Sequence, residues 1–339
     1  MKTAPNTLFL AAPRGFCAGV DRAIDIVEMA IEVYGAPIWV RHEIVHNRHV
    51  VEALRAKGAI FTDDLSDVPP GSVVIFSAHG VSPAVRREAA ERGLKALDAT
   101  CPLVTKVHLE ALRYARNGYT IVLIGHRQHV EVQGTQGEAP DAIVVVENVA
   151  EAEALEVPDP NKVAYISQTT LSVDDVRAVV EALKRRFPAV REPAKADICY
   201  ATQNRQDAVK ELANRCRVVL VVGAPTSSNA NRLVEVAGQL GARAHLIEAA
   251  EDIRPEWLSG NVGITAGAST PEHVVRACVE RVCALGDYRV EEFRLAEERV
   301  MFPLPGELLA VARRQGVEVG AGNQRAADRA ETEFKIRHH

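Results

Sequence analysis

Three cysteines, Cys17, Cys101 and Cys199, occupy similar local contexts in the sequence. Each follows the end of an expected strand and precedes an expected helix. A thiol at a helix N-terminus faces unpaired backbone N–H groups and the positive end of the helix dipole, which lower its pKa and favour metal binding. Taken singly, each of the three could equally be a small buried hydrophobic residue. The repeated context favours a shared metal-binding role.

The spacing of these cysteines indicates which metal group they would bind. Structural zinc sites usually take their ligands in close pairs, and these three thiols contain no C-x-x-C pair. A 4Fe-4S cluster normally has four cysteine ligands, so three would leave one iron open to a substrate oxygen. We therefore expect one 4Fe-4S cluster per chain. The other cysteines lie in or after helical stretches and are expected to pack as core residues: Cys216, Cys278 and Cys283.

Polar loops follow several of the expected strands and form a second group of candidate residues. Backbone N–H groups and Ser, Thr, Asn and His side chains in such loops can bind an anion, so their repetition predicts a phosphate or diphosphate pocket. Each single Ser or Asn also has the simpler interpretation of a helix cap. No G-x-x-x-x-G-K-[ST] loop is present, so an NTPase is not supported. The loops begin at Arg41, Ser77, Gly125, Ser167, Gly223 and Gly263.

Three histidines and one glutamate in these loops could take part in catalysis. His46, His79 and His129 occupy matching loop positions, and Glu131 lies two residues after His129. A carboxyl group in a partly desolvated pocket has a raised pKa, which would make Glu131 a proton donor near neutral pH. The alternative for each histidine is a satisfied surface residue, and for Glu131 a solvated loop carboxylate.

Short apolar runs alternate with amphipathic stretches, which is typical of parallel sheets covered by helices. The fold class is therefore α/β, and the similar cysteine contexts suggest three small units with mostly parallel sheets, arranged as a trefoil around a central iron–sulfur site. Ligands in such sheets bind beyond the carboxyl ends of the strands, so three edges could face one centre. Strands are expected at 8–10, 38–40, 73–76, 121–124, 143–146, 163–166, 218–222 and 262–265.

The expected units divide the chain at the cysteines. Residues 303–339 are rich in Arg, Glu and Ala without a clear core face, so a peripheral tail is expected there. The divisions are residues 1–17 as an N-terminal strand joining the third unit, 18–101 as the first unit, 102–198 as the second, 199–302 as the third and 303–339 as the tail.

Composition excludes several classes of function. The 339 residues carry a net charge of −5 and only 5% aromatic residues, so neither a basic field nor stacking platforms for nucleic acid are present. No apolar run approaches the roughly 20 residues that cross a bilayer. The apolar stretch from Leu8 to Ala12 is shorter than a signal-peptide core. We expect a cytoplasmic protein with neither a nucleic-acid nor a membrane partner.

Nine ordered motifs resemble those of one family, the 4-hydroxy-3-methylbut-2-enyl diphosphate reductases of the methylerythritol phosphate route to isoprenoids. The resemblance runs from about Leu8 to Leu285. The motifs are PRGFCAGVDRA, RHEIVHN, SAHGVS, DATCPLVTKVH, HVEVQGT, QTTLSVDD, DICYATQNRQ, SSNANRL and TAGAS.

The resemblance implies an oxidoreductase that uses two electrons and two protons to convert its diphosphate substrate into isopentenyl and dimethylallyl diphosphate. It implies a ferredoxin or flavodoxin as electron donor and a 4Fe-4S cluster on the three cysteines already singled out. Glu131 matches the residue that protonates the departing hydroxyl, Thr169 the residue that positions it, and His129 belongs to the same catalytic set. Positions that match the diphosphate-binding residues are His46, His79, His129, Ser227, Ser228, Asn229 and Ser269.

One departure from the family pattern and two alternatives remain. The family usually has proline between the matching His and Glu, where this chain has Val130, so the loop is less restrained in φ. The open iron would also suit a non-redox iron–sulfur hydro-lyase, which a need for a reductant would distinguish. A non-catalytic iron–sulfur redox sensor is the other alternative, although a sensor needs no proton donor such as Glu131.

Overall fold

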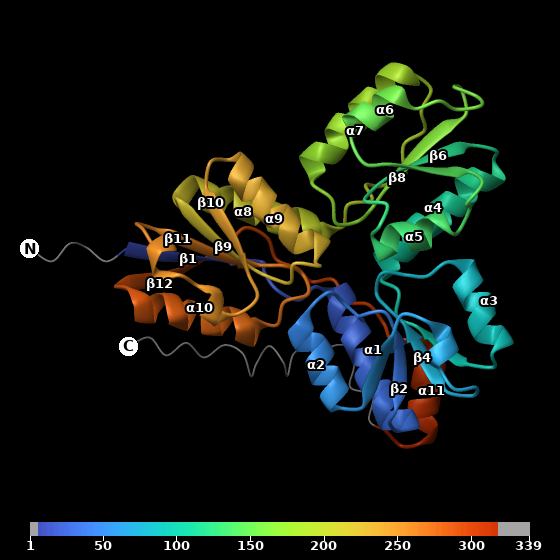
Figure 1. Cartoon of the computed structure of the whole chain (residues 1–339), viewed down its shortest axis with the longest axis horizontal. Helices are drawn as coiled ribbons and strands as arrows, with labels where there is room; N and C mark the ends of the chain where they lie inside the picture. The colour runs from blue at the N-terminus through green and yellow to red at the C-terminus, as the bar shows by residue number, and fades with distance from the viewer. Residues whose placement is uncertain (1–5, 318–339) are drawn as a thin grey trace, which may run out of the picture.

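The structure is a computed structural model that describes residues 6–317. It contains three separate sheets, and every strand pair in them is parallel. Figure 1 shows the three sheets with their helices as three lobes around a common centre. The predicted α/β class with small parallel sheets is confirmed.

The first lobe contains a four-stranded sheet whose central strands are buried. Its elements are α1 (Ala18–Tyr34), β2 (Ile38–Arg41), α2 (Arg48–Ala56), β3 (Ala59–Thr62), η1 (Leu65–Asp67), β4 (Val73–Phe76), α3 (Pro83–Glu91) and β5 (Lys95–Asp98). The strand order is β3-β2-β4-β5. Local sequence sets the helix starts, because Asn47 caps α2 by accepting from Val50 N and Pro83 begins α3 with a preset φ.

The second lobe has a three-stranded sheet in the order β7-β6-β8. Its elements are α4 (Pro102–Arg116), β6 (Thr120–Ile124), α5 (Val130–Gln136), β7 (Ile143–Val146), α6 (Val149–Ala154), β8 (Val163–Ser167) and α7 (Val173–Arg186). Ser172 caps α7, since its side chain accepts from Asp175 N. All five residues of β8 are buried, as expected for a parallel strand covered on both faces.

The third lobe has a five-stranded sheet that includes the first strand of the chain. Its elements are β1 (Asn6–Ala12), α8 (Tyr200–Arg215), β9 (Val218–Val222), α9 (Ser228–Gln239), β10 (Arg243–Ile247), η2 (Ala250–Asp252), η3 (Pro255–Trp257), β11 (Val262–Ala266), α10 (Glu272–Leu285) and β12 (Tyr288–Arg294). The order is β10-β9-β11-β1-β12. In Figure 1 the blue strand β1 lies among the orange elements of this lobe.

The chain passes from one lobe to the next at the three cysteines. Cys17 joins β1 of the third lobe to α1 of the first, and Cys101 joins β5 of the first to α4 of the second. Cys199 precedes α8, but no strand of the described residues ends just before it. Its segment returns beside β8 through a single bridge between Ala164 and Arg191. The expected strand-to-helix turn is therefore wrong for Cys199, while the unit boundaries stay predictions.

The helix α11 (Gly306–Arg314) corrects the expectation of a peripheral tail. Figure 1 shows this red helix beside α1 of the first lobe, far from β12 where the third lobe ends. Leu308 and Ala312 are fully buried in the core around α1. The spacing of four residues places both on one face of the helix, so a short core face does exist among the charged residues. Residues 318–339 of the expected tail lie outside the described residues.

Within residues 6–317, no helix combines the length and the apolar character that crossing a membrane requires.

Candidate functional site

A cavity of about 110 Å³ lies between the three lobes, and loops from all three line it. The structure brings every predicted site residue to this cavity. Gly19, Thr170 and Thr202 line it as well. The predicted residues on its wall are Cys17, His46, His79, Cys101, His129, Glu131, Thr169, Cys199, Ser227, Ser228, Asn229 and Ser269.

Each of the three cysteines is the N-cap residue of a helix. Cys17 caps α1, Cys101 caps α4 and Cys199 caps α8. Pro102 at the first position of α4 suits this geometry, since its missing N–H would be unpaired there anyway. The Cys199 sulfur accepts a hydrogen bond from Thr202 N at 3.4 Å. Free backbone N–H groups of three helices are thus directed at three sulfurs.

Burial outweighs these N–H groups in setting the protonation of the thiols. It raises the pKa of Cys17 to about 11 and that of Cys101 to about 12, and it raises the pKa of Cys199 as well. The expected lowering by the helix N-termini does act on each thiol, but desolvation is larger and reverses the net direction. A bound cationic group would supply the positive charge that three neighbouring thiolates need.

The sulfurs lie close enough together to share one group. A Cβ atom added at Gly19 would lie 2.7 Å from the Cys101 sulfur and 3.9 Å from the Cys17 sulfur, so both sulfurs face the same point. Within residues 6–317, no three His, Cys, Asp or Glu side chains are arranged around a position for a single metal ion.

Three histidine rings that line the cavity form a cluster. The ring centroids of His46 and His79 are 4.2 Å apart, and that of His129 lies 5.5 Å from His46 and 5.8 Å from His79. Burial lowers the pKa of His129 to about 4 and that of His79 well below its usual value. These two imidazoles are neutral at pH 7 and can donate hydrogen bonds without a fixed charge.

The position of His129 also determines which ring nitrogen faces the cavity with a proton. His129 is the N-cap of α5, and its Nδ1 accepts from Glu131 N at 3.2 Å. In the neutral ring the proton is then on Nε2. Val130, the departure from the family pattern, is the first helical residue here, and the cap hydrogen bond orders the loop.

Glu131 and Thr169 form a buried pair beside the cysteines. Thr169 Oγ1 donates to Glu131 Oε2 at 2.9 Å, and Thr169 N donates to Glu131 Oε1 at 2.6 Å. Glu131 is 3% exposed, and burial raises its carboxyl pKa although both Thr169 hydrogen bonds lower it. The pair joins the start of α5 to the segment after β8. In that segment Thr169 O accepts a hydrogen bond from Cys199 N at 3.1 Å. A carboxyl group in this setting retains its proton to higher pH than a solvated glutamate.

Ser227, Ser228 and Asn229 begin helix α9 at the rim of the cavity. Ser227 caps the helix by accepting from Ala230 N, and Asn229 Oδ1 accepts from Ala268 N at 2.9 Å. Ser269, from the loop after β11, donates its hydroxyl to His46 O at 2.9 Å. The start of a 12-residue helix with hydroxyl and amide donors is suited to an anion.

A family model described as LytB protein matches residues 8–283, which is most of the chain. The chain belongs to the LytB family. Its LytB relatives include a 4-hydroxy-3-methylbut-2-enyl diphosphate reductase of Bordetella pertussis, 60% identical over 89% of this chain and 94% of the relative. A protein of that name from Pseudomonas syringae pv. tomato is 56% identical over 88% of this chain and 97% of the relative.

Two solved structures of LytB-type reductases share the fold. The E-1-hydroxy-2-methyl-but-2-enyl-4-diphosphate reductase of Plasmodium falciparum has a TM-score of 0.90 at 40% identity, covering 92% of this chain and 100% of that one. A second structure, of an (E)-4-hydroxy-3-methyl-but-2-enyl diphosphate reductase called the terminal enzyme of the non-mevalonate pathway, has a TM-score of 0.58 at 32% identity. It covers 82% of this chain and 99% of that one.

Some residues of this LytB site were not expected from the sequence. Thr202 contacts the Cys199 sulfur through Oγ1 at 3.2 Å and accepts from Asn229 Nδ2, so it links the cysteine to the start of α9. Arg205 lies one turn further along α8 and is fully buried. The signal for both is helical spacing after Cys199, which places residues three and six positions later near the same face.

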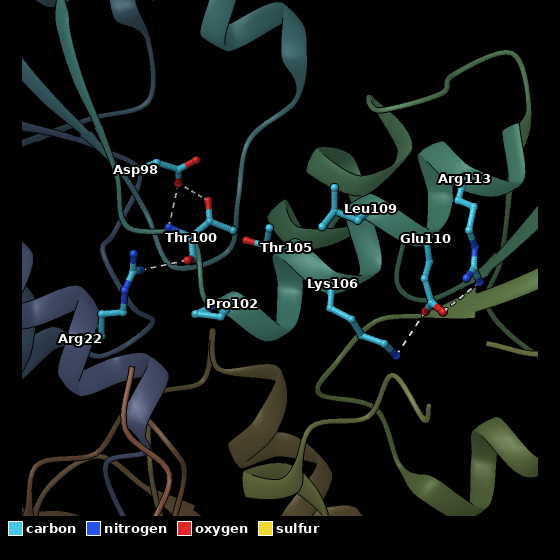
Figure 2. Close-up of a pocket in the computed structure, with 9 residues that line it drawn as sticks. All are labelled: Arg22, Asp98, Thr100, Pro102, Thr105, Lys106, Leu109, Glu110 and Arg113. Atoms are coloured by element: carbon cyan, nitrogen blue, oxygen red, sulfur yellow. Dashed lines mark hydrogen bonds and ion pairs between the residues drawn. The ribbon is translucent and has the colours of Figure 1, made fainter. Parts of the chain in front are cut away.

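A larger cavity of about 570 Å³ lies outside the LytB site, along the outer side of α4 (Figure 2). Figure 2 shows Lys106, Glu110 and Arg113 joined by ion pairs, and Arg22 donating to Thr100 O. Glu110 is thus paired with both Lys106 and Arg113, and no cysteine is among the residues that line this cavity.

Proposed function

We propose that this chain catalyses the reductive dehydroxylation of 4-hydroxy-3-methylbut-2-enyl diphosphate to isopentenyl and dimethylallyl diphosphate. The observation that carries the proposal is a single cavity that holds three cysteines, the buried Glu131–Thr169 pair and an anion-binding rim. Two electrons and two protons are consumed. The C–O bond of the hydroxymethyl group breaks, the oxygen leaves as water with one proton, and the second proton forms a C–H bond.

Cys17, Cys101 and Cys199 would hold a 4Fe-4S cluster. Support comes from the three cysteines lining one cavity, from the approach of the Cys17 and Cys101 sulfurs at Gly19, and from the helix N-termini, whose N–H groups offset the negative charge of thiolate ligands. When bound, the cluster supplies the two electrons and an iron that acts as a Lewis acid.

The diphosphate of the substrate would bind at the rim formed by the histidines and the start of α9. Ser227, Ser228, Asn229 and Ser269 offer hydroxyl and amide groups, and His46, His79 and His129 offer imidazole N–H groups. Because His79 and His129 are neutral, they can bind the anion by hydrogen bonds. Anchoring the diphosphate there would direct the hydroxymethyl end of the substrate to the cysteine side of the cavity.

Glu131 would act as the general acid, with Thr169 as the residue that positions the hydroxyl. The raised pKa of Glu131 keeps a proton available in a buried site, and the departure of water is far easier than that of hydroxide. Thr169 Oγ1 lies 2.9 Å from Glu131 Oε2. Its hydroxyl can therefore link the Glu131 carboxyl to the hydroxyl of the substrate through hydrogen bonds. His129, whose Nδ1 accepts from Glu131 N, orients the start of this loop.

The electron donor we propose is a ferredoxin or flavodoxin, and the setting is the cytoplasm. A reduced low-potential protein of this kind would deliver electrons singly. The six cysteines of the described residues are all free thiols, which agrees with a reducing compartment.

An anaerobic assay tests the proposed reaction. The protein is purified and reconstituted without oxygen, its iron content and absorbance are recorded, and dithionite with a viologen mediator and the substrate are added. Substrate-dependent oxidation of the mediator with formation of the two five-carbon diphosphates is the expected result. An intact cluster that releases water without consuming reductant would indicate the hydro-lyase instead, and an intact cluster without turnover would indicate the sensor.

Cysteine variants test the ligand assignment. Cys17→Ser, Cys101→Ser and Cys199→Ser are each expected to lose iron. Cys216→Ser is the matched control, because Cys216 is buried in the core beside β9 and faces another cluster of side chains. Equal iron content in all four variants would contradict the assignment.

A further inference from the structure

Arg205 is a fully buried arginine, and it is the largest side chain among the fully buried residues described. Burying a guanidinium is costly unless all its N–H groups have partners. Here they do. Arg205 Nε and Nη2 donate to Gly15 O at 3.2 and 2.7 Å, and Nη2 also donates to Phe16 O at 3.2 Å. Arg205 Nη1 donates to Ala201 O at 2.8 Å.

These acceptors belong to the loops that carry two of the three cysteines. Gly15 and Phe16 are the residues just before Cys17, and Ala201 lies two residues after Cys199 in the first turn of α8. One planar guanidinium therefore fixes the approach of the Cys17 loop to the start of the Cys199 helix. The two segments are far apart in the sequence, so side-chain contacts such as those of Arg205 must hold them together.

The remaining partner of Arg205 is a carboxylate on the outer side. Glu298 Oε1 accepts from Arg205 Nη1 at 3.0 Å, and Glu298 Oε2 accepts from Arg205 Nη2 at 3.4 Å, which makes the ion pair bidentate. Its side chain is 14% exposed, whereas that of Arg205 is 0% exposed. The compensating negative charge thus sits further towards solvent than the positive charge.

Electrostatics connect this pair to the cysteines. The guanidinium of Arg205 donates to the backbone oxygen of Phe16, next to Cys17, and to that of Ala201, two residues after Cys199, so its charge lies close to both cysteines. An arginine keeps its charge in proteins, so its field acts on whatever group the sulfurs hold. Screening is weak at a buried site.

We infer that Arg205 is a positioning and redox-tuning residue: it fixes the Cys17 and Cys199 loops against each other and raises the reduction potential of the cluster they bind. The inference rests on the proposed function, because it needs the cluster. Reduction adds negative charge, and a nearby buried positive charge stabilises the reduced state more than the oxidised state. Glu298 acts in the opposite sense and sets how much of the Arg205 charge is felt.

The test measures the midpoint potential of the reconstituted holoenzyme by a redox titration followed by electron paramagnetic resonance. Arg205→Gln, which removes the charge, is expected to shift the potential to a more negative value. Glu298→Gln keeps an oxygen acceptor for Arg205 but removes the opposing charge, and it is expected to shift the potential to a more positive value. Arg205→Lys keeps the positive charge but loses the planar set of N–H donors. Its midpoint potential should therefore shift less than that of Arg205→Gln, while it loses iron faster than the wild type on dilution.

The opposite signs separate tuning from a structural effect. A merely loosened site admits water in both variants, and it would move both potentials in the same direction. Thermal unfolding of the metal-free proteins reports whether each variant folds. If Arg205→Gln does not fold, the potentials of Glu298→Gln and Arg205→Lys still test the inference. If Glu298→Gln binds a normal cluster but its midpoint potential is unchanged or more negative, the inference about Arg205 is wrong. That outcome would leave the proposed function intact. Wild-type protein that binds no iron after reconstitution would overturn the proposed function along with it.

Discussion

At the scale of single residues, burial shifts the ionisable groups of the cavity towards their neutral forms. It raises the pKa of the cysteines and of Glu131, and it lowers that of His79 and His129. Desolvation is the largest cause in each case, because surrounding protein atoms displace part of the water that would stabilise a charge. A cavity of this kind lets a ligand and a cofactor bring the charges, while the protein supplies protons and hydrogen bonds.

Replacing Glu131 tests its role as the acid. Glu131→Gln keeps the size of the side chain and an acceptor for Thr169, so the cluster and substrate binding should persist. Turnover should fall by about 10² to 10⁴, the usual contribution of a positioned general acid. Steady-state kcat is compared with iron content and substrate affinity in the same preparation. Glu156→Gln, the same change at an exposed position, should leave all three unchanged, and a normal kcat in Glu131→Gln would remove the assignment.

The raised pKa of Glu131 predicts the sign of the pH dependence. Burial moves the carboxyl pKa upward from 4.5, so the protonated donor persists to higher pH and is lost as pH rises through the raised value. We expect kcat to be level on the acid side and to decline towards alkaline pH. Glu131→Gln should lack this decline. A pH profile of kcat with saturating substrate and a non-titrating mediator measures it, and an identical profile in the variant would assign the decline to another group.

At the scale of elements, helix N-termini position the cysteines. Helices α1, α4 and α8 each begin directly after one cysteine, so the first turns of three helices start at the wall of one cavity. The close approach of α1 to Cys101 requires a residue without a side chain. Gly19 fulfils that requirement, because any Cβ there would lie 2.7 Å from the Cys101 sulfur.

Adding one methyl group at Gly19 should displace a ligand. In Gly19→Ala the Cβ forces the Cys101 sulfur or α1 to move, and we expect most of the bound iron to be lost after reconstitution. The matched control is Gly238→Ala in α9, where a Cβ meets open space. That change should keep full iron content and stabilise the protein by about 0.5 to 1 kcal/mol, as Gly to Ala does within a helix. Iron analysis and thermal unfolding measure both, and full iron content in Gly19→Ala would show that the contact is not limiting.

At the scale of the whole molecule, the chain path brings the site together. The cysteines lie where the chain crosses between lobes, and β1 and α11 connect lobes that are far apart in sequence. β1 pairs with β11 and β12, while α11 returns to α1 in the first lobe. Folding of the site therefore depends on contacts between the beginning and the end of the described chain.

The contact of α11 with α1 should stabilise the first lobe. Leu308 is fully buried among residues of that core, so Leu308→Ala should lower the free energy of unfolding by about 2 to 5 kcal/mol. Leu295→Ala is the control, because Leu295 is 49% exposed and lies outside that core. Denaturant unfolding of the metal-free protein measures the difference. Equal stability of the two variants would mean that α11 docks without contributing to the fold.

The strands that the apolar runs do not predict are all at sheet edges. β9, with the sequence VVLVV, is buried on both faces and is evident from hydrophobicity alone. β5 and β12 read KALD and YRVEEFR, because an edge strand is partly exposed to water and tolerates charged residues. β3 and β10 lie at edges as well. The local pattern therefore predicts every interior strand and both edge strands of the second lobe, but it misses the edge strands of the other two sheets.

The sequence by itself determined the α/β class, the three cysteine contexts, the polar loops and the family resemblance, because these depend on residues near one another along the chain. Only the tertiary structure decided the direction of the cysteine pKa shifts, the burial of Arg205 and the docking of α11. Each depends on how many atoms from distant segments surround a group, and helix or strand periodicity carries no information on that. A thiol at a helix N-terminus has a lowered pKa in isolation, yet the three lobes that enclose Cys17 raise it.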